Sequence, residues 1–205
     1  MSRVIVIEFM SLDGVIHDPD GSDGSAQGGW AFRYGPEAVA GDKFALGEVL
    51  DNGTMLLGRR TWQLFASLWP SRSDPFSAKM NASPKLVVSR SLEGAGEWQN
   101  SSVLKGDLVT EVRERKQNRD IWVTGSVSVV RTLMAHDLVD EYRMVVFPLI
   151  LGEGARLFPD GSAPVNLDLV SAQTVGPAVR LMYTRSRATP ASSALGPRSS
   201  ANRTG

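Results

Sequence analysis

The chain has 205 residues, of which 42% are hydrophobic and 21% charged, with 22 basic and 22 acidic side chains. This length and composition suit one compact domain with a modest appendage. The basic residues are spread without a block and no apolar run approaches a membrane span, so we expect neither a nucleic-acid partner nor a membrane. The absence of cysteine excludes disulfides and thiolate catalysis, and two histidines leave little to ligate a metal. We expect a cytoplasmic protein that binds no metal.

The first half of the chain predicts strands and helices in alternation. An apolar strand over 4–7 leads into a loop over 11–35 that is rich in Gly, Asp and Ser. Loops of this length inside a compact domain are usually functional, so we expect it to border the site. One helix is predicted to begin at Pro36 and to end near Asn52-Gly53. After it we expect a strand over 54–57, a helix over 60–68, a loop with one short helix over 71–84, and a strand over 85–89.

The second half continues the alternation and ends in a hairpin. Asp107 is a predicted N-cap for a helix to Gln117, before a strand over 121–124, a helix over 127–135 and a strand over 140–147. The runs 167–175 and 178–185 flank a Gly-Pro pair and predict antiparallel strands. This order is typical of an α/β domain with a mostly parallel sheet. Residues 188–205 are nearly devoid of large apolar groups, so we expect a disordered tail after a functional domain over 1–187.

Three of the predicted strands end in residues that suit an anion. The segments that follow them are Gly58-Arg59-Arg60-Thr61, Ser89-Arg90 and Thr124-Gly125-Ser126. In open α/β sheets, ligands bind outside the carboxyl ends of the strands, where helix N-termini present unpaired N–H groups. Guanidinium groups and hydroxyls together suit a phosphorylated nucleotide better than a simple carboxylate.

The order of these motifs resembles a known family. The segment Ser11 to Ile16 (Ser-Leu-Asp-Gly-Val-Ile) precedes the three strand ends, and the segment Phe147 to Gly154 with Leu157-Phe158 follows them. Over residues 3–185 the chain resembles the dihydrofolate reductase-like superfamily, and within it the reductase domain of the bifunctional riboflavin-biosynthesis deaminase-reductase. The resemblance implies a three-layer α/β sandwich with a mostly parallel central sheet and an antiparallel C-terminal hairpin. It also implies a homodimer that uses NADPH.

The resemblance implies specific cofactor contacts. Arg59 and Thr61 match positions that meet the 2′-phosphate and the pyrophosphate of NADPH, and Ser89-Arg90 matches a second contact to the 2′-phosphate. The turn at 124–126 matches a glycine-rich turn, but it has one glycine where relatives often have two or three. The predicted cofactor residues are Gly58, Arg59, Thr61, Ser89, Arg90, Thr124, Gly125, Ser126 and Ile16. Two guanidinium groups attract a dianionic phosphate far more than a ribose hydroxyl, which favours NADPH over NADH.

Catalytic residues are harder to predict, because hydride transfer needs little from the protein beyond positioning and a proton. In dihydrofolate reductases a carboxylate on the helix before the Gly-Arg-x-Thr turn holds the pterin, which points to Asp42. Glu37 and Glu48 lie on the same predicted helix and remain alternatives. The second candidate is Asp13, for which the alternative is an Asx-type turn residue that shapes the loop. His17 is a further possible proton donor, for which the alternative is an exposed loop histidine.

The substrate side is predicted from three residues. Trp30, in the long loop, is the tryptophan we expect as a substrate wall. Gly152 and Gly154 are expected to form a backbone-lined turn near the substrate, by the same resemblance. The alternative for these glycines is a tight connection before the final hairpin.

Together these motifs predict an NADPH-dependent reductase of a small heterocyclic or ribosylamino substrate. The expected activity is similar to that of 5-amino-6-(5-phosphoribosylamino)uracil reductase or dihydrofolate reductase. The alternative is a nucleotide-binding module without turnover, with a regulatory or scaffolding role. An unambiguous proton donor near the nicotinamide would separate the two, and the sequence alone does not identify one.

Overall fold

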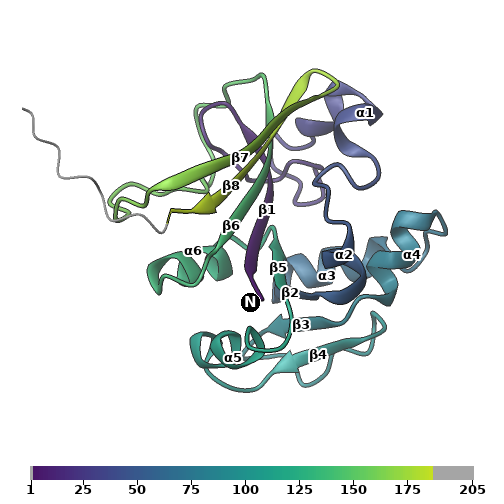
Figure 1. The fold of residues 1–205 in the computed structure, drawn as a ribbon. Helices are drawn as coiled ribbons and strands as arrows, with labels where there is room; N and C mark the ends of the chain where they lie inside the picture. Colours follow the sequence, from purple (N-terminus) through teal and green to yellow (C-terminus); the bar gives the residue numbers. More distant parts are fainter. Residues whose placement is uncertain (1, 187–205) are drawn as a thin grey trace, which may run out of the picture.

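A computed structural model describes residues 2–186, so the tail predicted over 188–205 lies outside the described residues. Eight strands form one sheet in the order β4-β3-β2-β5-β1-β6-β8-β7 (Figure 1). The strands are β1 (Val4–Ser11), β2 (Thr54–Gly58), β3 (Lys85–Val88), β4 (Ser101–Leu104), β5 (Ile121–Thr124), β6 (Glu141–Phe147), β7 (Leu167–Val175) and β8 (Ala178–Arg185). The first six run parallel and the last two form the predicted antiparallel hairpin. The fold is therefore the α/β sandwich that the sequence predicts.

Helices cover both faces of the sheet, with α5 and α6 on one side and α2, α3 and α4 on the other (Figure 1). The helical elements are η1 (Ala31–Tyr34), α1 (Pro36–Val39), α2 (Glu48–Asn52), α3 (Arg59–Leu68), α4 (Pro75–Ala82), α5 (Leu108–Arg115) and α6 (Val127–Ala135). Among residues 2–186, no helix has both the length and the apolar character needed to cross a membrane.

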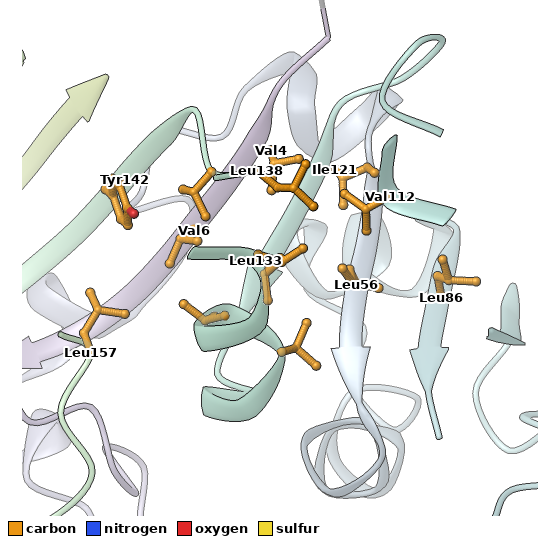
Figure 2. Packing of buried hydrophobic residues seen from close by; sticks show 14 of the residues in the cluster. Val4, Val6, Leu56, Leu86, Val112, Ile121, Leu133, Leu138, Tyr142 and Leu157 are labelled. Carbon is orange, nitrogen blue, oxygen red and sulfur yellow. The ribbon is translucent and has the colours of Figure 1, made fainter. Parts of the chain in front are cut away.

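The core has two layers because neighbouring residues of a strand face opposite sides of the sheet. Val4 and Val6 of β1 pack with Leu133 of α6 (Figure 2), whereas Ile5 packs with Trp62 of α3 on the other face. All five side chains are at most 2% exposed. Burying a side chain of this kind contributes about 1.5–3 kcal/mol, so the central strands are the most firmly held part of the sheet.

The single helix predicted over 36–52 is wrong, because the chain forms α1 and α2 with an irregular loop over 40–47 between them. Gly47 has a φ of 52°, which a right-handed helix does not contain. The Asp42 carboxylate accepts hydrogen bonds from the N–H groups of Leu46 and Gly47 at 2.7 and 3.0 Å. Such local bonds to a side chain compete with the backbone hydrogen bonds of a helix. The helical spacing of apolar residues therefore continues through a segment that is not helical.

The sequence also misses β4, whereas the helix N-cap at Asp107 is confirmed. Strand β4 has only four residues and begins with two serines, so it shows no clear alternation. The Asp107 carboxylate accepts a hydrogen bond from the Thr110 N–H at 3.0 Å, as an N-cap does. The missed strand lies at the edge of the sheet, beside β3, and leaves the order of the central strands unchanged.

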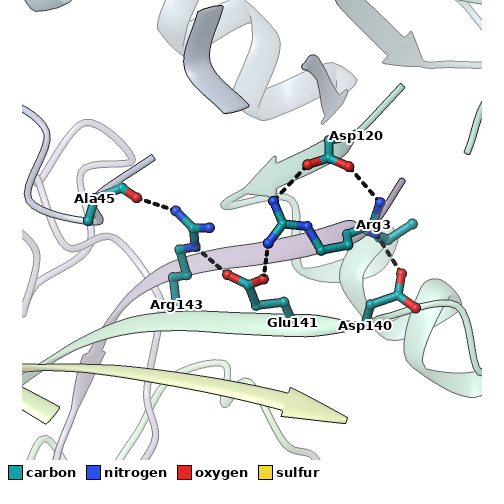
Figure 3. Close-up of polar contacts among 7 residues, drawn as sticks. Arg3, Ala45, Asp120, Asp140, Glu141 and Arg143 are labelled. Carbon is teal, nitrogen blue, oxygen red and sulfur yellow. Dashed lines mark hydrogen bonds and ion pairs between the residues drawn. The ribbon is translucent and has the colours of Figure 1, made fainter. Parts of the chain in front are cut away.

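Ion pairs hold the amino ends of the central strands together (Figure 3). Arg3 donates to Asp120 at 2.9 Å and to Glu141 at 2.7 Å, which joins the starts of β1, β5 and β6. Arg143 donates to Glu141 at 2.5 Å and also to the Ala45 carbonyl in the 40–47 loop. Glu141 and Arg143 are only 2% and 4% exposed. Since each buried charge has a partner, this cluster is structural, and it anchors a loop that leads to the opposite end of the sheet.

Candidate functional site

A cavity of about 1600 Å³ lies at the carboxyl ends of β1, β2, β3 and β5. Pockets for drug-sized ligands are usually about 300–1,000 Å³, so this one has room for a cofactor beside a substrate. Every predicted cofactor residue lines it, namely Ile16, Gly58, Arg59, Thr61, Ser89, Arg90, Thr124, Gly125 and Ser126. The structure thus brings together residues that are up to 110 positions apart, from Ile16 to Ser126.

Two helix N-termini meet at the wall of the cavity. Helix α3 begins after Gly58 and α6 begins after Ser126. The Ser126 hydroxyl accepts the Gly58 N–H at 2.8 Å, and the Ser126 N–H donates to the Thr61 hydroxyl at 3.1 Å. Gly125 has a φ of 60°, and a Cβ there would lie 3.0 Å from the Thr61 Cγ2. Glycine is therefore favoured at Gly125, and the positive ends of two helix dipoles point toward one space.

Arginines lie at the outer part of this wall. Arg59 and Arg90 are exposed and line the cavity, and Arg59 donates to the Ser91 hydroxyl at 2.8 Å. The Ser89 hydroxyl accepts the N–H groups of Ser91 and Leu92 at 3.2 and 3.1 Å, which shapes the turn after β3. A phosphate placed between the two guanidinium groups would receive forked, charge-assisted hydrogen bonds.

The long loop over 11–35 borders the cavity, as predicted, and is tied to α3. His17 and Asp23 line the cavity and pair at 2.9 Å, and Asp23 also pairs with Arg60 at the start of α3. The Trp30 indole N–H donates to the His17 carbonyl at 2.8 Å. These contacts hold one side of the cavity with residues that are distant in sequence.

Asp13, a predicted catalytic residue, joins two turns. Its carboxylate accepts the Ser11 hydroxyl at 2.7 Å and the N–H groups of Leu151 and Gly152 at 3.1 and 2.9 Å. The hydrogen bond from Ser11, with help from the two backbone bonds, lowers the pKa of Asp13 to about 2. Asp13 therefore has no proton to donate at neutral pH, and both it and Gly152 lie outside the lining of the cavity.

The other predicted catalytic and substrate residues also lie outside the lining of the cavity. Asp42 is exposed and holds its own loop, as described above. Trp30 is fully buried and packs edge-on against Phe147, with ring centroids 5.5 Å apart. Gly154 has a φ of 114° and lies against Val15, where a Cβ would come within 2.7 Å of the valine Cγ1. Their positions give all three a part in packing the loops that surround the site.

Sequence reasoning missed Glu8, a buried carboxyl on β1 that lines the cavity. Glu8 is 3% exposed, and among the described residues its Oε1 has no hydrogen-bond partner. Burial raises the pKa of Glu8 well above its ordinary value, and the Gly125 backbone offsets this only in part. The available signal was a single acidic residue inside an apolar run, Val4-Ile5-Val6-Ile7 before it and Phe9-Met10 after it.

Sequence reasoning also missed Lys43, at the inner end of the cavity. Its ammonium group donates to the Val39 carbonyl and lies 5.8 Å from the Phe9 ring and 5.9 Å from the Phe76 ring. Burial lowers the pKa of Lys43 to about 8, and the charge of Asp42 opposes this. Nothing in the flanking sequence marks this lysine, because its burial depends on the loop conformation.

Five aromatic side chains line the same inner part of the cavity. We call them the aromatic arm, which consists of Phe9, Phe44, Phe65, Trp69 and Phe76. Such rings offer a flat apolar wall, which suits a planar ligand. Within residues 2–186, no group of three or more acidic or histidine side chains is placed to hold a metal ion. The cavity therefore combines a polar, cationic outer part with an aromatic inner part.

The fold and the cavity define an α/β protein whose ligand site lies at the carboxyl edge of its sheet. The model of the RibD C-terminal domain family matches residues 2–181, and the chain belongs to this family.

Two curated proteins and two solved structures are similar to this chain. Over 129 residues the chain is 33% identical to the uncharacterized protein YyaP of Bacillus subtilis (strain 168), a match that covers 59% of this chain and 67% of YyaP. It is 25% identical over 191 residues to the uncharacterized protein YwjB of the same organism, a match that covers 89% of this chain and 98% of YwjB. The solved structure of a protein assigned to riboflavin biosynthesis, from Shewanella sp. PV-4, has a TM-score of 0.70 at 21% identity. The match covers 90% of this chain and 99% of that protein. The solved structure of a pyrimidine reductase-like protein from Corynebacterium diphtheriae has a TM-score of 0.57 at 11% identity. The match covers 91% of this chain and 93% of that protein.

Proposed function

We propose that the chain is an NADPH-dependent reductase that transfers a hydride to a small heterocyclic or ribosylamino substrate. The observation that carries this proposal is the shared cavity, in which the strand-end residues of β2, β3 and β5 meet the aromatic arm. Membership of the RibD C-terminal domain family supports a reductase-type activity. The polar part suits the phosphates of a dinucleotide, and the aromatic part suits a flat substrate ring.

The residues of the outer part fit such a cofactor. Arg59 and Arg90 would hold the 2′-phosphate, and the turn at 124–126 would let the pyrophosphate approach the N-termini of α3 and α6. A side chain at Gly125 would press on Thr61, because its Cβ would lie 3.0 Å from the Thr61 Cγ2. When bound, the cofactor supplies the hydride, and the protein supplies orientation, exclusion of water and a proton.

The residues of the inner part favour a planar substrate with a carbonyl or anionic group. The aromatic arm would exclude water from the ring, and Lys43 would donate a hydrogen bond from a cation with few competing partners. Backbone contacts fix this lysine: the Lys43 carbonyl accepts the Arg180 guanidinium at 3.2 Å, and the nearby Ala45 carbonyl accepts Arg143.

Titration of tryptophan fluorescence with NADPH and NADH, followed by an NADPH oxidation screen, tests the proposal. The screen would present pterins, flavin precursors and cyclic imines. Binding of NADPH with turnover of at least one class supports it. Binding without turnover across the panel favours the alternative, a nucleotide-binding module. Absence of NADPH binding at millimolar concentration overturns the proposed NADPH-dependent reductase.

We propose in addition that the protein is a homodimer. Strand β7 lies at the edge of the sheet, and Leu169 and Val170 on it are 58% and 54% exposed. An apolar strand edge of this kind tends to pair with another chain. Light scattering at micromolar concentration should therefore return twice the chain mass, and Leu169→Lys should shift the mass toward the monomer. A monomer mass for the unmodified protein would contradict the proposal.

A further inference from the structure

Glu8 is a buried carboxyl that the proposed cofactor and substrate contacts leave without a role. It lines the cavity, is 3% exposed, and its Oε1 has no hydrogen-bond partner among residues 2–186. A polar atom that is buried without a partner destabilises the folded protein. Buried polar groups without partners are rare, so one that faces a ligand cavity calls for a functional explanation.

The order of the strands indicates which part of a dinucleotide would reach Glu8. Across the sheet, β3, β2, β5 and β1 are consecutive. Arg90 follows β3, Arg59 follows β2, and the turn at Gly125 follows β5. A cofactor whose 2′-phosphate lies at the two arginines and whose pyrophosphate lies at Gly125 therefore extends toward β1. Ile7 of β1 pairs with Thr124 of β5, so Glu8 lies directly beside the Gly125 turn. The redox-active ring would thus lie near Glu8.

The other ionisable groups near the cavity are less suited to supply a proton there. Asp13 has a pKa of about 2 and is ionised. His17 pairs with Asp23 in the long loop. Lys43 contacts the ring of Phe9, and successive residues of a strand point to opposite faces, so Lys43 and Glu8 lie on opposite sides of β1.

Resting on the proposed function, we infer that Glu8 is the proton donor of this site. As the hydride reaches the carbon of a C=N or C=O bond in the substrate, the π electrons of that bond move to the nitrogen or oxygen. That atom takes the proton from the Glu8 carboxyl. Glu8 is left as a carboxylate and recovers a proton from water, and the cofactor is left oxidised, so atoms and electrons balance.

The environment favours the protonated form of Glu8 before the reaction. Burial raises its pKa well above the ordinary 4.5, and within the part of the chain that the structure describes a hydrogen bond with the backbone of Gly125 opposes this. The ionisable side chains that line the cavity include Arg131 on α6, Arg59 and Arg60 on α3, and His17, Asp18 and Asp23 in the long loop. On β6, Tyr142 has a pKa raised by burial to about 12 and stays neutral. A neutral carboxyl does not repel the phosphates of the cofactor. A raised pKa also suits a general acid, because such a group works best when its pKa lies near the working pH.

Proton release on binding of the oxidised cofactor tests this inference without any substrate. NADP+ has a positive ring, and a positive charge beside Glu8 would lower the pKa of Glu8 and expel its proton. NADPH has a neutral ring and would not. Calorimetric titrations at pH 7 in buffers of different ionisation enthalpy measure the protons released. We expect NADP+ to release more than NADPH in the unmodified protein, and the excess to vanish in Glu8→Gln, which should still bind both forms with affinities within about threefold.

A matched variant distinguishes Glu8 from Lys43, the buried lysine that also lines the cavity. Lys43→Met should retain the excess proton release, because Lys43 lies on the other side of β1. An excess that persists in Glu8→Gln, or that disappears only in Lys43→Met, would overturn the role of Glu8 while leaving cofactor binding intact. Failure of both cofactor forms to bind would instead overturn the proposed function, and the role of Glu8 with it. Circular dichroism of each variant verifies that the fold is retained.

Discussion

The two ends of the central strands use charged residues in opposite ways. At the amino ends, Arg3, Asp120, Glu141 and Arg143 form a network of ion pairs (Figure 3). At the carboxyl ends, Glu8 is buried and its Oε1 has no hydrogen-bond partner among residues 2–186, and Arg59 and Arg90, which line the cavity, are exposed. Paired charges hold strands in register, whereas polar groups without partners are available to a ligand. The same strands therefore hold the fold at one end and form the site at the other.

Two buried lysines show the same contrast. The ammonium group of Lys85, at the amino end of β3, donates to the carbonyls of Asn81, Ser83 and Gln99 at 2.9, 2.7 and 3.2 Å. The ammonium group of Lys43 has one carbonyl partner and faces the cavity. Burial lowers the pKa of both to about 8. Since the two pKa values agree, the number of hydrogen-bond partners is what distinguishes the structural lysine from the available one.

The largest effect is expected from Glu141→Ala at the amino end. The substitution leaves Arg143 buried without its carboxylate and should lower the free energy of unfolding by about 3–5 kcal/mol, as measured by urea denaturation. Glu114→Ala, an exposed glutamate on α5, is the control and should change stability by no more than about 0.5 kcal/mol. A small loss for Glu141→Ala would show that the ion-pair cluster does not hold the strands.

At the carboxyl end, Glu8→Gln should change how stability depends on pH. The folded pKa of Glu8 is raised, so below pH 4.5 both states hold the proton, and above it only the folded state does. The unmodified protein should therefore lose stability relative to Glu8→Gln as pH rises from 4.5 toward the folded pKa. The expected slope is about 1.4 kcal/mol for each pH unit. Urea denaturation from pH 5 to pH 8 measures it, and a difference that is independent of pH would contradict the raised pKa.

Cofactor preference tests the arginines at the same end. NADPH should bind at least about tenfold more tightly than NADH, a difference of about 1.4 kcal/mol, and the double substitution Arg59→Ala with Arg90→Ala should remove most of it. Arg113→Ala, an exposed arginine on α5 away from the cavity, should leave the preference unchanged. Equal affinities for the two cofactors in the unmodified protein, by fluorescence titration, would refute the assignment of the two arginines.

The smallest expected effect is that of Gly125→Ala in the turn after β5. An alanine at a φ of 60° is strained by about 1 kcal/mol, and its Cβ would press on Thr61. We expect a small drop in melting temperature and weaker NADPH binding. Gly94→Ala, where nothing lies within 4 Å of the added Cβ, should change neither. Unchanged NADPH affinity in Gly125→Ala would show that the turn does not approach the cofactor.

Short-range patterns in the sequence determined the parallel sheet, the C-terminal hairpin and the residues at the strand ends. Arg59, Arg90 and Ser126 each follow an apolar strand, and parallel strands all end at one edge, so their meeting in one cavity follows from topology. The helix over 36–52 failed because a side-chain bond from Asp42 and a positive φ at Gly47 override the apolar period.

Only the tertiary structure decided which ionisable groups face the cavity. Asp13 lies in the expected loop, whereas Asp42 lies in an irregular loop and not on the predicted helix, and backbone N–H groups donate to both carboxylates. Trp30 packs into the core instead of the cavity, and Lys43 becomes buried because Arg143 and Arg180 hold its loop against the sheet. The sequence records the type and position of each residue. The burial and the partners that set its chemistry come from segments far away in the chain, which meet only in the folded protein.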